Sequence, residues 1–275
     1  MAKAIRNPRA VFRRLALIAR ASARQLKHAA DDSISIWRER RGSNFGHGRN
    51  GVPDETGEPI ELNTIAYKAL VSLEQHQERR SSAQRQFAAL GLDVEWKIPA
   101  KLEDVPWASV PRVYRDRPEK ASHAVTLISV LDEVERAKVP SFMHFEDDVI
   151  FHSRISTLLP RLRVPRDWKF IYLGGRNFGT RIKVWPGLVR SDHVVDLHAV
   201  IVRSDMIPHL RKVLLDPTID FIDLDHRFAT LHRQYPAYLC RPNLAWQSPH
   251  SDDSGTKPAY CNYYAGGAVR IGQGD

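Results

Sequence analysis

The chain has 275 residues, with 41 Lys and Arg against 32 Asp and Glu and a hydrophobic content of 43%. This length and composition suit one large α/β domain or two small ones, and they exclude fibrous, collagen-like and wholly disordered chains. Two cysteines, Cys240 and Cys261, are too few for a disulfide framework and favour a reducing compartment. The sequence has no signal peptide and no apolar run of the roughly 20 residues that cross a bilayer, so we expect a cytoplasmic protein.

The excess positive charge is confined to the N-terminal part of the chain. Residues 1–50 contain 12 Lys and Arg and 3 Asp and Glu, whereas the other 225 residues contain 29 of each sign. Proteins that bind nucleic acid usually carry their basic surface on the folded domain, so this distribution argues against nucleic acid as a partner.

Residues 8–28 are predicted to form a basic amphipathic helix. Pro8 suits a first helical turn, arginines and lysines recur at helical spacing, and apolar residues gather on another side. Such a helix can lie on an anionic membrane surface, which would hold the protein at the inner face of the cell membrane. The alternative is a solvated arm that packs on its own domain or on a partner.

Four regions follow from composition. Residues 1–41 form the basic arm, and residues 42–60 are rich in Gly, Pro and polar groups, which is typical of a flexible linker. Residues 61–258 are the predicted folded domain, and residues 259–275 are a C-terminal tail.

Strand and helix patterns alternate along the domain. Apolar or alternating segments predict strands at 66–73, 94–98, 141–145, 170–173 and 199–202. Helical periodicity and end signals predict helices at 74–90, 122–138, 207–215 and 225–234. This alternation predicts an α/β fold with a mostly parallel sheet flanked by helices.

Three consecutive carboxylates, Glu146, Asp147 and Asp148, follow the apolar strand 141–145. Ligands of parallel sheets bind beyond the carboxyl ends of the strands. In an extended chain Glu146 and Asp148 point to one side and Asp147 to the other. Hard divalent cations prefer such oxygen ligands and often bridge them to a substrate diphosphate. The alternative is a solvated acidic turn.

Other candidates lie elsewhere in the domain. Asp223 and Asp225 come at the start of a predicted helix, where a carboxylate could cap the helix or serve as a general base. His250 lies in a polar loop and could bind a metal or phosphate, or simply be exposed. Arg79 and Arg80 lie at the start of a predicted helix, where they could bind an anion or simply form a pair on the surface.

Several segments, in chain order, resemble motifs of glycosyltransferase family 25, the bacterial lipopolysaccharide biosynthesis enzymes related to the collagen galactosyltransferases. The resemblance covers roughly residues 65–255 and is that of a divergent member, because Ser72 replaces the usual Asn. The matching segments are Val71-Ser72-Leu73 with Arg79-Arg80, Ser122-His123, Phe145-Glu146-Asp147-Asp148-Val149, Asp167 to Gly174, Ala199 to Ser204, Asp225, and Pro242 with Gln247 and His250.

The resemblance implies a GT-A fold, a Rossmann-type sheet, and an inverting hexosyltransferase that uses a nucleotide sugar, usually a UDP-sugar. It further implies a divalent metal, Mn²⁺ or alternatively Mg²⁺, and a glycan or lipid-linked glycan acceptor. By this resemblance the metal ligands are Glu146, Asp148 and His250. The base is Asp225, with Asp223 as second choice, and the donor-binding residues are Ser72, Arg79, Arg80 and Asp147.

Two other interpretations remain open. The same carboxylates could serve another metal-dependent phosphohydrolase or nuclease, which would need a nucleophile-generating metal cluster. The domain could also be a non-catalytic module that binds a membrane or a partner.

Overall fold

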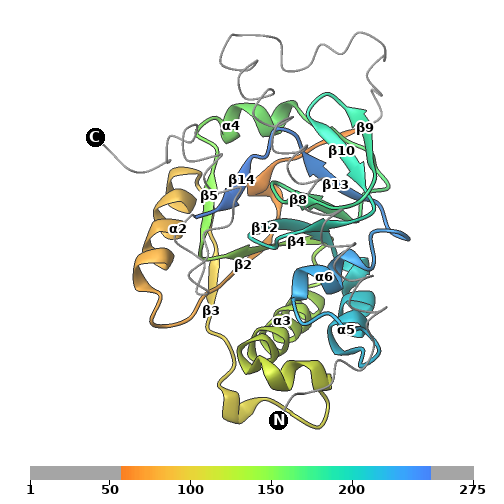
Figure 1. Ribbon diagram of the computed structural model, residues 1–275. Helices are drawn as coiled ribbons and strands as arrows, with labels where there is room; N and C mark the ends of the chain where they lie inside the picture. Colours follow the sequence, from red (N-terminus) through yellow and green to blue (C-terminus); the bar gives the residue numbers. More distant parts are fainter. Residues whose placement is uncertain (1–56, 249–275) are drawn as a thin grey trace, which may run out of the picture.

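The computed structural model describes residues 57–248 (Figure 1). The predicted basic helix at 8–28, His250 and the tail at 259–275 lie outside the described residues. The predictions made for them therefore stay predictions.

One eight-stranded sheet forms the centre of the fold. Its strands are β2 Tyr67–Val71, β3 Glu95–Lys97, β4 Ser141–Glu146, β7 Phe170–Tyr172, β9 Arg181–Trp185, β10 Leu188–Ser191, β12 Ala199–Arg203 and β13 Ala237–Cys240. Three small two-stranded pairs accompany it, β1 Glu58–Pro59 with β6 Arg163–Val164, β8 Arg176–Asn177 with β11 Val194–Val195, and β5 Val149–Phe151 with β14 Ala245–Gln247.

The α-helices of the described chain are α2 Gln77–Ala89, α3 Pro118–Ala137, α4 Ile155–Leu158, α5 Ile207–Leu215 and α6 Leu224–Ala229. Short 3₁₀ segments are η1 Leu62–Thr64, η2 Leu102–Asp104, η3 Arg112–Asp116, η4 Leu159–Arg161 and η5 Ser204–Met206. None of the helices between residues 57 and 248 combines the length and apolar character that crossing a membrane requires.

The sheet has the order β3-β2-β4-β12-β7-β13-β10-β9. β3, β2 and β4 pair in parallel, and β7 pairs in parallel with β13, but β12 is antiparallel to both β4 and β7. β10 is antiparallel to β13 and β9. Six of the eight strands thus run in one direction, and β10 and β12 run in the other. The predicted α/β fold with a mostly parallel sheet is confirmed.

Helices cover both faces of this sheet, each over its own apolar cluster. Alternate residues of the strands face opposite sides, so that Phe142 of β4 packs with α3 and α5 while Met143 and Phe145 pack with α2. In Figure 1, α2 flanks one side of the sheet and α3, α5 and α6 gather on the other. Burial of these two faces supplies the main stabilisation of the fold.

Most helix ends follow local signals, with three differences from prediction, the first being that α2 begins at Gln77 rather than at residue 74. α5 spans the predicted residues, and Gly91, with φ of 64°, ends the turn after α2. α3 starts four residues earlier than predicted because Pro118 occupies its first turn. α6 ends at Ala229 rather than Gln234 because His232 turns into the core, where its ring contacts the Tyr172 hydroxyl at 3.1 Å.

The described fold begins before the predicted domain boundary at residue 61. Glu58 and Pro59, placed by composition in the linker, form β1 on the edge of β6. The Glu58 carboxylate accepts hydrogen bonds from Trp168 Nε1 and Arg203 Nη2, both at 2.6 Å. These long-range partners hold a segment whose own sequence carries no strand signal.

Candidate active site at the carboxyl end of β4

The acidic triplet, Glu146 to Asp148, lies at the point in the sheet where successive strands are added first on one side and then on the other. From β2 the chain passes to β3 on one side, whereas β4 is followed by strands on the other side. Ligand crevices of open α/β sheets form at such points. Glu146 is the last residue of β4, and Asp147 and Asp148 form the turn into β5. As expected from strand alternation, Asp147 faces α2 while Glu146 faces α3.

Asp147 is buried and fully engaged by neighbouring side chains. Its carboxylate accepts a hydrogen bond from Ser72 Oγ at 2.7 Å, lies 3.2 Å from His76 Nδ1 and forms an ion pair with Arg79. The predicted donor-binding residues Ser72, Arg79 and Asp147 are therefore brought together. They join the end of β2 to the start of α2.

Arg80 lies apart from this network. Its guanidinium stacks over the Trp96 ring at 3.7 Å and donates to the carbonyl oxygens of Leu73 and Glu74 at 3.3 and 3.2 Å. The two adjacent arginines thus have separate partners. A donor-binding role for either of them stays a prediction.

Three carboxylates converge on the α3 side of β4. Burial raises the pKa of Glu146 well above its ordinary value, and the negative charges of Asp148 and Asp225 raise it further. Lys120, on the first turns of α3, acts in the opposite direction. The site therefore concentrates negative charge, with Asp148 buried and Glu146 and Asp225 partly buried.

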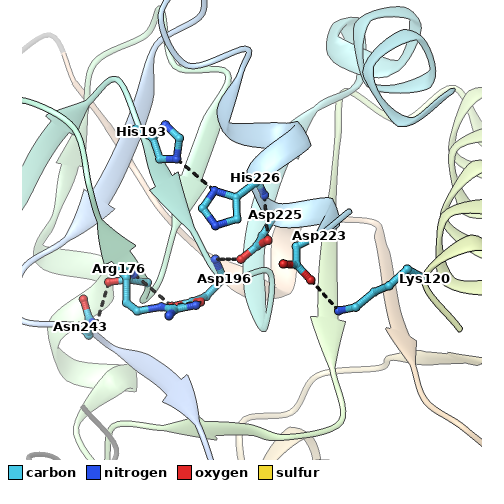
Figure 2. Close-up of polar contacts among 9 residues, drawn as sticks. Lys120, Arg176, His193, Asp196, Asp223, Asp225, His226 and Asn243 are labelled. Carbon is cyan, nitrogen blue, oxygen red and sulfur yellow. Dashed lines mark hydrogen bonds and ion pairs between the residues drawn. The ribbon is translucent and has the colours of Figure 1, made fainter. Parts of the chain in front are cut away.

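Asp225 is fixed by backbone donors at the start of α6 (Figure 2). The N–H of Asp196 donates to Asp225 Oδ2 at 3.1 Å, and the N–H of His226 donates to Oδ1 at 2.8 Å. Burial and then the negative charge of Asp196 raise the pKa of Asp225. A carboxylate of raised pKa is a stronger proton acceptor than an ordinary aspartate.

Asp196 supports this arrangement from a constrained backbone. It has φ of 78°, a conformation uncommon for residues other than glycine, and its carboxylate accepts from Arg176 Nε at 2.9 and 3.0 Å. Burial alone would raise the pKa of Asp196, but the charge and hydrogen bonds of Arg176 lower it below its ordinary value. Asp196 therefore remains ionised beside Asp225.

Asp223 occupies the N-cap position of α6 but makes no capping hydrogen bond. Its carboxylate instead lies 3.1 Å from Lys120 Nζ, as Figure 2 shows. Burial alone would lower the pKa of Lys120, but Asp223 and the nearby Glu146 and Asp225 raise it. The helix-capping alternative therefore does not account for Asp223.

Two histidines, the partly buried His123 and the buried His144, lie beside Glu146. Burial lowers the pKa of His123 to about 4 and that of His144 to about 3, so both imidazoles are neutral at pH 7. Their ring centroids are 6.1 Å apart. Within residues 57–248, only His123, His144 and Glu146 bring three candidate ligand atoms within 4.8 Å of one another.

Sequence reasoning did not include Lys120, Arg176 and Asp196 in the site. The strand 199–202 was recognised, but an aspartate before a parallel strand would lie at the opposite edge of the sheet. Because β12 is reversed, its start lies beside the end of β4, with Ala199 opposite Phe145. No local signal in the sequence indicates this reversal.

The chain resembles two solved structures at low identity. One is a glycosyltransferase involved in the glycosylation of the major capsid of PBCV-1, with 10% identity, a TM-score of 0.39 and coverage of 61% of this chain and 74% of that one. The other is the apo form of the glycosyltransferase GlyE of Streptococcus pneumoniae TIGR4, with 10% identity, a TM-score of 0.35 and coverage of 62% and 44%. No protein-family model matches the sequence, and no curated protein matches it significantly. Likenesses this weak carry no argument about activity.

Proposed function

We propose that the protein is a glycosyltransferase of the GT-A type that moves a sugar from a nucleotide-sugar donor to a hydroxyl group of a glycan acceptor. The observation that carries the proposal is the convergence of Glu146, Asp148 and Asp225 at the carboxyl end of β4, at the change of direction in the sheet. The order of the sequence motifs that resemble glycosyltransferase family 25 supports it. By that resemblance the donor is a UDP-sugar and the acceptor a glycan or lipid-linked glycan.

The carboxylate side chains at this site are the kind of ligand that a hard divalent cation, Mn²⁺ or Mg²⁺, prefers. Glu146, Asp148 and Asp225 offer carboxylate oxygens, and a bound cation would relieve the repulsion that, after burial, raises the pKa of Glu146. We propose that Asp148 and Glu146 hold the cation, with His250 as a further ligand. The cation, when bound, would offset the negative charge that develops on the leaving diphosphate.

Asp225 is the proposed general base. Its carboxylate would take the proton of the acceptor hydroxyl while that oxygen attacks the anomeric carbon. The bond from this carbon to the donor diphosphate breaks in the same step, so the product has inverted configuration. The N–H groups of Asp196 and His226 hold the carboxylate in place. Asp223, paired with Lys120, is the weaker candidate because a cation already balances its charge.

Thermal unfolding of the full chain with a panel of nucleoside diphosphates, each with and without Mn²⁺, tests the donor and metal sites together. A ligand that binds only the native state raises the unfolding midpoint by mass action. We expect UDP to raise the midpoint only when Mn²⁺ is present, and Asp148→Asn to abolish that shift. Asp205→Asn is the matched control, because this exposed carboxylate pairs with Lys169 outside the cluster.

Release of UDP from UDP-sugars, measured with and without glycan acceptors, tests the transfer itself. Release that rises with an acceptor and yields an elongated glycan supports the proposal. Hydrolysis of DNA or phosphate esters with no nucleotide-dependent stabilisation would favour the phosphohydrolase instead. If no nucleotide shifts the midpoint and no sugar is transferred, the proposal is wrong and the non-catalytic module is favoured.

Membrane attachment through residues 8–28 is a separate proposal. It predicts that the full chain binds vesicles containing anionic lipid and that a variant lacking residues 1–56 does not. Equal binding by the two proteins would contradict it.

A further inference from the structure

We propose that His123, His144 and Glu146 form a binding site for a transition-metal cation of the zinc class. His144 and Glu146 are two residues apart on β4 and so face the same side of the sheet, toward α3. His123 lies on α3 and faces them. One candidate ligand atom from each of the three residues lies within 4.8 Å of the other two.

An independent observation indicates that this cluster lacks a ligand. The His144 side chain is buried, with 1% of the residue exposed, and neither ring nitrogen has a hydrogen-bond partner among residues 57–248. The same holds for Nε2 of His123. Buried polar side-chain atoms are rarely left without a partner, because their hydration is lost with nothing in return. A metal ion would provide the partner for a nitrogen of each ring.

The spacing of the cluster is compatible with one ion. Zinc binds imidazole nitrogen and carboxylate oxygen at about 2.0–2.2 Å, so two ligand atoms of a tetrahedral site are roughly 3.4 Å apart. Any two of the three atoms are at most 4.8 Å apart, so each separation would have to shorten by at most about 1.4 Å to reach that distance. Three protein ligands would leave one position for water or substrate.

The type of ligand separates this site from the proposed hard-cation site. Imidazole nitrogen favours Zn²⁺, Co²⁺ and similar ions, whereas sites built from carboxylates alone suit Mg²⁺ and Mn²⁺. The two sites share Glu146, but Asp148 belongs to one and the histidines belong to the other. The inference does not rest on the proposed sugar transfer, and each can fail without the other.

Nearby charges permit a cation at this position. The ammonium group of Lys120, one turn before His123 on α3, is paired with the Asp223 carboxylate at 3.1 Å. Glu146 contributes a negative charge to the cluster, and Asp148 and Asp225 lie close enough to influence it. Lys120 disfavours positive charge at His123 and Asp147 favours it, while Glu146 supplies a carboxylate within the cluster itself.

Titration of the chelator-treated full chain with Co²⁺ tests the site, because four-coordinate Co²⁺ absorbs visible light strongly and hydrated Co²⁺ absorbs it weakly. We expect a band that saturates at one Co²⁺ per chain and disappears when Zn²⁺ is added. His123→Gln and His144→Gln should each lower the Co²⁺ affinity by at least about 100-fold, which exceeds the typical effect of losing a residue that merely orients a ligand. His232→Gln, another buried neutral histidine, should leave the titration unchanged.

Two further measurements separate loss of the metal site from loss of the fold. Far-UV circular dichroism shows whether each variant is folded. Anomalous scattering from crystals grown with Co²⁺ locates the ion in the unchanged protein if a variant does not fold. An ion between α3 and β4 supports the site, whereas no saturable band, or an ion only elsewhere, overturns it. Asp148→Asn should abolish the Mn²⁺-dependent UDP shift and retain the Co²⁺ band, which distinguishes this site from the proposed function.

Discussion

The backbone N–H of Asp196 donates to the Asp225 carboxylate at 3.1 Å and so joins the segment between β11 and β12 to the start of α6. The bond links two chain segments 29 residues apart and fixes the orientation of the proposed base. It depends on the unusual backbone of Asp196, whose own carboxylate is held by Arg176. The proposed base is therefore positioned by the main chain, and its ionised neighbour strengthens it as a proton acceptor.

Asp225→Asn is expected to lower kcat by about 10²–10⁴-fold, the usual contribution of a general base. Its stability should change by less than about 1 kcal/mol, because one lost acceptor is offset by relief of the repulsion from Asp196. Steady-state kinetics and urea unfolding measure the two effects. Asp223→Asn is the matched control and should keep kcat within about tenfold. Turnover retained by Asp225→Asn would exclude this residue as the base.

Arg227→Lys should destabilise the fold strongly, although it keeps the positive charge. The Arg227 guanidinium is fully buried and donates to the carbonyl oxygens of five residues around the end of α5 and the loop before α6. These acceptors are Val213, Leu214, Asp216, Ile219 and Phe221. Lysine cannot reproduce this planar set of donors, and each buried carbonyl left unpaired costs about 1–3 kcal/mol.

We expect urea denaturation to show a loss of at least about 3 kcal/mol for Arg227→Lys. Arg211→Lys is the control, because Arg211 pairs with the exposed carboxylates of Asp132 and Glu135. Its effect should stay below about 1 kcal/mol. Similar effects of the two substitutions would contradict a structural role for the buried guanidinium.

Gly174→Ala should be poorly tolerated for a steric reason. An added Cβ at this position would lie 1.6 Å from the carbonyl oxygen of Ala245, where the chain after β7 passes close to β14. Neither backbone can move without breaking its own hydrogen bonds. We expect a loss of about 3 kcal/mol or more in the free energy of unfolding, at the upper end for overpacking.

Gly91→Ala separates steric overlap from backbone strain. Gly91 has φ of 64°, but no atom lies within 4 Å of an added Cβ. Its cost should be about 1–2 kcal/mol, the penalty for a left-handed residue. Chemical denaturation of the two variants compares these effects directly, and a larger loss for Gly91→Ala would contradict the packing described here.

His232 should make stability fall as pH decreases below its ordinary pKa. Burial lowers the pKa of His232 in the folded state to about 3, whereas the unfolded chain titrates near the ordinary value of 6.5. Between these values only the unfolded chain binds the proton, so stability is lost as pH falls below 6.5, by about 1.4 kcal/mol per pH unit. Above pH 6.5 the group contributes no slope.

Urea unfolding at pH 5 and pH 7 measures this effect. The stability difference between the two pH values should be about 2 kcal/mol smaller in His232→Gln than in the unchanged protein, because glutamine does not titrate. An equal difference in the two proteins would show that His232 is not buried as a neutral ring.

Sequence periodicity predicted the central elements because their side chains are sorted by a local rule. β4 is a mostly apolar run whose residues alternate between the two faces of the sheet, and α5 carries a clear apolar stripe, so both were located closely. The same alternation placed Asp147 opposite Glu146. The hairpin of β9 and β10 was not predicted, because exposed residues such as Ile182 and Arg190 interrupt its pattern.

The site was predicted only in part because it combines local and long-range features. The acidic triplet follows a recognisable strand, and Asp225 lies at a recognisable helix start. The Arg176–Asp196 pair depends on the reversed direction of β12, which is decided by how the sheet assembles. The approach of His123 to His144 likewise depends on the packing of α3 against β4, which no spacing within either segment encodes.

The alternation along β4 also limits which insertions and deletions are compatible with folding of this strand. Met143 and Phe145 pack under α2, and His144 and Glu146 face α3. Insertion or deletion of one residue within the strand would exchange the two sets, placing carboxylate and imidazole groups in apolar packing and phenylalanine beside Asp225. Only insertions or deletions of two residues would leave each side chain on its present face of the sheet. Insertions and deletions are therefore expected to be tolerated in the loops on either side of β4. Insertion or deletion of a single residue inside β4 should prevent folding.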